Sequence, residues 1–107
     1  MTQPISRPTS EQVQASLKTV VDPEMGINIV DLGLVYGVRV VDNRIEIALT
    51  MTNPDRPTTG TMASEVEQTV RTAFEQIDDV EVSLVFQPPW TLDRLSEKAR
   101  EALGVER

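Results

Sequence analysis

The loop "TNPDRPTTGT", residues 52–61, separates a run of alternating apolar residues from a pattern with helical period. A helix that begins there presents unpaired N–H groups and a partial positive charge at its first turn. An arginine, several hydroxyls and free amides together suit an anion or a carboxylate of a partner. A solvated turn with capping threonines is the alternative, and the spacing of a P-loop is absent. The candidate site residues are Thr52, Asn53, Asp55, Arg56, Thr58 and Thr59.

A second candidate is the acidic segment "DPEMGINIVDLG", with carboxylates at Asp22, Glu24 and Asp31. Three carboxylates in one segment can face a ligand or hold a hard cation. The alternative is a structural turn, in which Asp22 and the following proline end a helix and Gly26 supplies a permissive backbone. Both interpretations stay open on local chemistry alone.

The 107 residues contain no cysteine and no histidine. A thiolate nucleophile, a Ser-His-Asp triad, and any metal site built from thiolate or imidazole therefore cannot come from these residues. Carboxylate acid–base chemistry alone would lack a nucleophile. We expect no enzyme activity, no metal centre and no cofactor bound by this chain alone.

The charge balance is acidic, with 17 Asp and Glu against 10 Lys and Arg and a net charge of −7. This balance argues against binding to nucleic acid or to an anionic membrane surface. The start "MTQPISRPTS" has no apolar region typical of a signal peptide, and the longest apolar stretch is interrupted by Asp31. These features predict a cytoplasmic protein.

The apolar periodicity predicts a single α+β domain over residues 9–107, preceded by a flexible tail over 1–8. The expected order is αββαβα, with helices packed on a three-stranded sheet in two layers. Thr9 and Gln12 have the spacing of a capping box, and Ser96 is the expected N-cap of the last helix. The helices are expected over 10–21, 61–77 and 95–104, and the strands over 34–41, 44–52 and 80–86.

Several apolar positions are expected in the core or as packing anchors. The first helix should bury the face that ends with Val20 and Val21, and Trp90 should anchor the chain after two prolines. The third strand is expected to place one apolar face against the core, made of Val80, Val82, Leu84 and Phe86.

Three segments, "DPEMGINIVDLGLVYGVRV", "TMTNPDRP" and "FQPPWTLDRLSEKAREALG", closely resemble the iron–sulfur cluster assembly (FSCA) domain family with its PaaD-like and SufT-like members. The resemblance implies a small domain that helps to deliver iron–sulfur clusters or other metal centres to client enzymes, commonly oxygenases or their reductases. It implies a carrier or adaptor whose partners are client metalloenzymes or cluster-assembly proteins. An iron–sulfur cluster would then be bound only through a partner.

The family's loop usually reads Thr-x-Pro-x-Cys-Pro, and here Arg56 stands in the place of the cysteine. A helix N-terminus lowers the pKa of a thiol and so favours a metal ligand. Arginine stays protonated and binds no metal, but it can hold an anion or a carboxylate of a partner. The resemblance with this departure implies an accessory factor that acts without its own cysteine ligand. The alternatives are an effector or subunit-like module of a multicomponent oxygenase, or a small anion-binding domain that uses the 52–61 loop.

Overall fold

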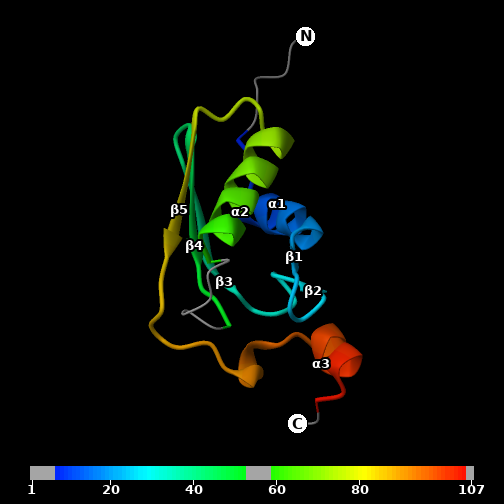
Figure 1. The fold of residues 1–107 in the computed structure, drawn as a ribbon. Helices are drawn as coiled ribbons and strands as arrows, with labels where there is room; N and C mark the ends of the chain where they lie inside the picture. Colours follow the sequence, from blue (N-terminus) through cyan, green and yellow to red (C-terminus); the bar gives the residue numbers. More distant parts are fainter. Residues whose placement is uncertain (1–6, 53–58, 106–107) are drawn as a thin grey trace.

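A three-stranded sheet forms the centre of the computed structural model, which describes residues 7–52 and 59–105 (Figure 1). Strand β3 (Val35–Val41) pairs antiparallel with β4 (Arg44–Leu49) through a two-residue turn at Asp42, whose φ is 52°. Strand β5 (Asp79–Leu84) lies parallel to β4, so the strand order is β3-β4-β5. A parallel pair needs a crossover connection, and helix α2 (Thr59–Ala73) supplies it.

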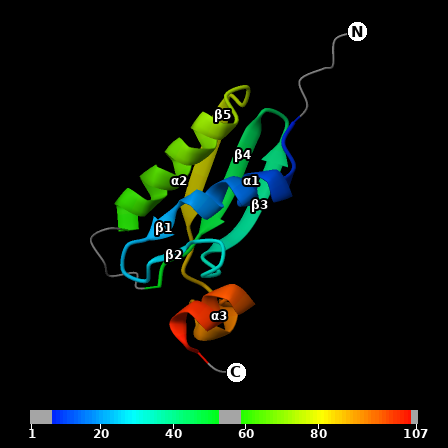
Figure 2. The same ribbon diagram turned by 90° about the vertical axis from the view of Figure 1, so that its right-hand side faces the viewer.

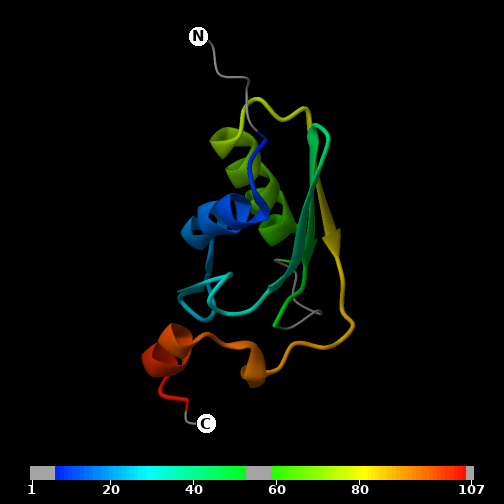
Figure 3. The ribbon, with the colours of Figure 1, turned by 180° about the vertical axis from the view of Figure 1, so that it is seen from behind.

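Two helices cover one face of this sheet, as Figures 2 and 3 show from two sides. Helix α1 (Ser10–Ser16) continues as the 3-10 turn η1 (Leu17–Thr19) and packs beside α2. The predicted capping box is present, since the Gln12 amide donates to Thr9 Oγ1 at 3.0 Å and the Thr9 amide to Gln12 Oε1 at 2.9 Å. The predicted α+β fold with helices on a three-stranded sheet is therefore confirmed.

The core lies between the helix layer and the sheet and is almost wholly aliphatic. It takes one face of each helix, the inward residues of β4, and the turn that precedes β3. Val66 of α2 and Ile45 of β4 have no exposed surface at all. The other fully or nearly fully buried side chains of this cluster include Val13, Leu17, Val20, Ile29, Leu32, Leu34, Ile47, Leu49 and Val70.

A second, two-stranded sheet was not predicted. Strands β1 (Val21–Asp22) and β2 (Ile27–Asn28) pair antiparallel directly after η1. The first helix therefore ends before the predicted residue 21, and Val21 is 45% exposed instead of buried. The prediction for Val21 was wrong because the change from helix to strand turns its side chain away from the face that carries Val20.

The last part of the chain, residues 86–105, crosses the lower end of the sheet in Figure 1, and we call it the C-terminal strap. It contains η2 (Leu92–Arg94) and α3 (Glu97–Leu103), which lies beside β1 and β2 and outside the layer of α1 and α2. The Ala99 amide donates to Ser96 Oγ at 3.1 Å, and Gly104 ends the helix with a φ of 70°. Both predicted ends of this helix are thus confirmed.

Some predicted ends and faces differ from the structure. Strand β5 stops at Leu84, and Leu84 and Phe86 are 37% and 39% exposed where a buried face was expected. The α2 layer covers the beginning of β5, so the apolar face is covered at Val80 but open near the strand end. Pro8, which was expected in the tail, is buried, and so is the polar residue Thr50 directly after β4. None of the helices in residues 7–52 and 59–105 is long and apolar enough to cross a membrane.

Candidate functional site

The predicted loop connects the end of β4 to the start of α2. Asn53, Asp55, Arg56 and Thr58 lie outside the described residues, so the expectations for them stay predictions. Thr52 is half-buried on the β4 side, and Thr59 is the first residue of α2. The structure thus defines where the loop leaves the sheet and where the chain returns.

The carboxyl ends of the two parallel strands, β4 and β5, lie at the same edge of the sheet. In open sheets with parallel strands, ligands are commonly bound just outside this edge. Met51 after β4 and Met62 in the first turn of α2 are both buried, so the two ends of the connection are fixed in the core.

The C-terminal strap is attached to this edge through Tyr36. The Tyr36 hydroxyl of β3 donates to the Pro88 carbonyl at 2.7 Å. The guanidinium carbon of Arg94 lies 4.4 Å from the centroid of the Tyr36 ring, which is a cation–π contact. Sequence reasoning missed this cluster, because Tyr36 lies more than fifty residues from Pro88 and Arg94 and no local pattern links them.

A second attachment of the strap uses the turn before β3. Trp90 Nε1 donates to the Leu32 carbonyl at 2.6 Å, so its predicted role as a packing anchor is confirmed. Gly33, with a φ of 79°, faces the strap so closely that a Cβ atom there would lie 2.3 Å from the Arg94 carbonyl oxygen. Only glycine suits that position, because the backbone is left-handed and the neighbour is backbone.

Asp22 has a structural role in the β1–β2 turn. Its buried carboxylate accepts the amides of Glu24 at 2.7 Å and Met25 at 3.2 Å. Its own carbonyl accepts the Gly26 amide at 2.7 Å. The side chain is therefore directed into its own turn, which is the structural alternative that the sequence left open.

Asp31 joins β2 to the strap. Asn28 Nδ2 donates to the Asp31 carboxylate at 2.8 Å, and the Asp31 carbonyl accepts the Ser96 amide at 2.8 Å. The hydrogen bond from Asn28 is the largest cause that holds the pKa of Asp31 below its ordinary value. Partial burial opposes this shift, while Ser96, Lys18 and Lys98 add to it.

The acidic segment does not form a cation site in the part of the chain that the structure describes, where no three acidic, cysteine or histidine side chains come close enough to hold a metal ion. Of the two interpretations left open for Asp22, Glu24 and Asp31, the one in which they hold a hard cation together has no support among the described residues. Asp22 faces its turn and Asp31 faces Asn28, so these two carboxylates have separate surroundings.

A groove of about 320 Å³ lies between η1, the β1–β2 sheet and α3. Lys18 and Lys98, the only two lysines of the sequence, both line it together with Asp31. Sequence reasoning did not bring these residues together, since eighty residues separate the lysines. Residues of η1, β2 and α3 form the groove together, and only the tertiary structure brings these elements next to one another.

Comparison with known proteins places this geometry in a family. The profile of the family described as "Iron-sulfur cluster assembly protein" matches residues 10–84. The Fe-S protein maturation auxiliary factor YitW of Bacillus subtilis is 38% identical over 97 residues, which cover 90% of this chain and 94% of the relative. The auxiliary factor SufT of Staphylococcus aureus is 44% identical over 87 residues, which cover 80% of this chain and 98% of the relative.

A solved structure agrees with the fold. The domain of unknown function DUF59 from Bacillus anthracis superimposes with a TM-score of 0.85 and 38% identity, and the match covers 91% of this chain and 92% of the other. Because this match covers 91% of the chain, it extends beyond residues 10–84, which the family profile matches. The chain belongs to the iron–sulfur cluster assembly protein family, as its resemblance in three segments predicted.

Proposed function

We propose that this chain is a non-catalytic accessory factor in the maturation of iron–sulfur proteins, and that it acts as an adaptor that gives no ligand to the cluster. The family and the names of the relatives, which are auxiliary maturation factors, support the maturation role. One observation carries the adaptor part of the proposal. The 107 residues contain no cysteine and no histidine, while iron in protein-bound clusters is held by thiolates or imidazoles.

The fold supports an adaptor that presents a surface to its partners. The frame of β4, β5 and α2 holds both ends of the 52–61 connection, with Met51 and Met62 in the core. The strap is attached beside it through Tyr36 and Trp90. In this proposal the cluster stays on a cluster-assembly protein or a client, and Arg56 contacts an anionic group of that partner.

Deletion of the gene in the organism that encodes the chain tests this function. We expect a loss of activity and of iron and sulfide content in several iron–sulfur enzymes, measured per amount of each enzyme. Zinc and flavin enzymes from the same cells are the control and should keep full activity. Expression of the wild-type chain should restore the iron–sulfur enzymes, and Arg56→Ala should restore them only in part while the protein stays folded.

Two outcomes would contradict the proposal. Unchanged cluster content of the iron–sulfur enzymes in the deletion strain would show that the chain has no role in their maturation. Loss of turnover in a single oxygenase that keeps its full cluster content would favour an effector of that oxygenase instead.

A further inference from the structure

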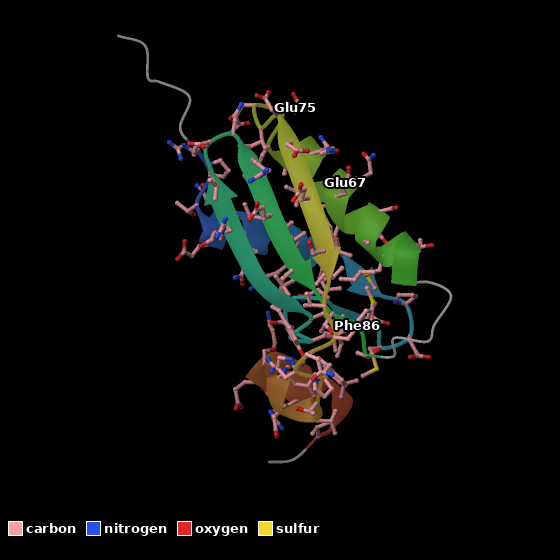
Figure 4. All side chains as sticks on the ribbon, turned by 90° about the vertical axis from the view of Figure 1, so that its left-hand side faces the viewer. Glu67, Glu75 and Phe86 are labelled. Carbon is pink, nitrogen blue, oxygen red and sulfur yellow. The ribbon has the colours of Figure 1, made fainter. Side chains whose placement is uncertain are left out.

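Strand β5 is an open edge of the sheet. Its one strand neighbour is β4, and within residues 7–52 and 59–105 no strand lies along its other side. Figure 4 looks onto the face of the sheet that the helices leave open, where β5 is the outermost strand and α2 runs behind and beside it. An open edge is a template for an additional strand unless the chain protects it.

The backbone of β5 directs three residues to the open side. The amides of Asp79 and Val85 donate to the carbonyls of Asn43 and Leu49, at 3.3 and 2.9 Å. In a parallel ladder, alternate residues bond the same neighbour, so the odd-numbered residues of β5 bond β4. The even-numbered residues, Val80, Val82 and Leu84, therefore direct their N–H and C=O groups away from β4, toward the open edge.

The side chains along this edge are acidic over most of its length and apolar at its end. Glu81 lies on the open face of the sheet, and Glu67 and Glu75 lie on and after α2 along β5 (Figure 4). Asp79 begins the strand, and its carboxylate lies 3.7 Å from Arg71, which also binds Glu67. Where β5 ends, Leu84 and Phe86 are exposed (Figure 4).

We propose that the β5 edge binds an extended segment of a partner protein as a fourth strand, and that this segment alternates lysine or arginine with apolar residues. Backbone groups of Val80, Val82 and Leu84 give the affinity, as in other cases of strand addition. Basic side chains of the segment lie beside Glu81 on the open face, and its apolar side chains lie beside Leu84 and Phe86. The inference rests on the proposed function only for the identity of the partner.

A second copy of the chain is a poor occupant of this edge. Each copy carries a net charge of −7, and pairing two β5 edges would bring Glu75, Asp79 and Glu81 of both copies to one surface. Like charges on facing strands are destabilising, and charged edge strands prevent self-association. The same charges attract a basic segment, so charge selects the partner.

Two synthetic eight-residue peptides test the proposal with the full chain. One alternates lysine with valine, and the other alternates glutamate with valine. Amide hydrogen exchange, followed by nuclear magnetic resonance, is the measurement. The lysine peptide should slow exchange at the outward amides of Val80, Val82 and Leu84, while those of Glu81 and Ser83 are already protected by β4. The glutamate peptide should leave all five amides unchanged.

Variants of the chain locate the contact. Glu81→Lys should weaken binding of the lysine peptide about threefold, the effect of one exposed ion pair. Glu101→Lys on α3 makes the same charge change on an exposed residue of another element and should leave the affinity unchanged at physiological salt. Val82→Pro removes one outward N–H without loss of a bond to β4 and should abolish the protection. Circular dichroism verifies the fold of each variant. If Val82→Pro does not fold, the comparison of Glu81→Lys with Glu101→Lys still locates the contact.

The proposal is overturned if the lysine peptide leaves the three outward amides unprotected, or if both peptides protect them equally. This readout does not depend on cluster maturation. Normal iron–sulfur enzymes in a deletion strain would contradict the proposed function but not the binding of a strand to β5. Unprotected amides would contradict the binding of a strand but not the proposed function.

Discussion

At the scale of single residues, Gly26 and Gly33 allow the cost of a strained backbone to be compared with the cost of a steric clash. Gly33 and Gly26 both have a positive φ, 79° and 71°, but only a Cβ at Gly33 would meet another atom, the Arg94 carbonyl at 2.3 Å. We expect Gly26→Ala to cost about 1 kcal/mol of unfolding free energy from conformation alone. Gly33→Ala should cost about 3 kcal/mol, because the strap must also move. Urea denaturation of both variants measures the difference, and equal losses would show that the strap moves freely away from Gly33.

The same scale shows where local chemistry was a good guide. The capping residues Thr9 and Ser96 were predictable, because a cap depends on neighbours within three positions. Tyr36 was not, since its hydroxyl and ring bind Pro88 and Arg94, which only tertiary folding brings near. The candidate residues of the 52–61 loop stay predictions, apart from the positions of Thr52 and Thr59 at its two ends.

At the scale of elements, the stability of the domain depends on the apolar face that α2 packs against the sheet. Val66 is fully buried, so Val66→Asp places an unpaired carboxylate in the core and should cost about 4 kcal/mol. That is a large share of the stability of a small domain, about 5 to 15 kcal/mol. Gln68→Asp adds the same group at an exposed position of the same helix and should change the melting temperature little. A Val66→Asp protein as stable as Gln68→Asp would mean that this face of α2 is open to water.

Longer elements were predicted better than short ones for a physical reason. Helix α2 and strands β3 and β4 carry enough apolar repeats to define a face, and the structure has all three. Strands β1 and β2 have two residues each, which is too short for any period to be visible. Their existence depends on pairing with each other and on the Asp22 turn, so the sequence indicated a turn but no sheet.

At the scale of the whole molecule, the absence of thiolate and imidazole makes a direct prediction. After anaerobic reconstitution with iron and sulfide, the purified chain should retain no cluster, because it offers neither thiolate nor imidazole. Visible absorbance and sulfide analysis after desalting measure how much cluster the chain retains. Arg56→Cys is the matched variant, because it provides one thiol at the position where the resemblance places the family's cysteine. A stoichiometric, stable cluster on the wild-type chain would contradict the adaptor proposal.

The attachment of the strap also has an optical consequence. Trp90 is the only tryptophan of the chain, and its indole binds the Leu32 carbonyl while it packs against the core. Indole emission shifts to longer wavelength when the ring becomes hydrated, so the fluorescence of the unlabelled protein reports the strap alone. Circular dichroism reports mainly the helices and the sheet. Two signals that change at different urea concentrations would mean that the strap detaches from a domain that is still folded, so a built-in fluorophore can follow local opening during partner binding.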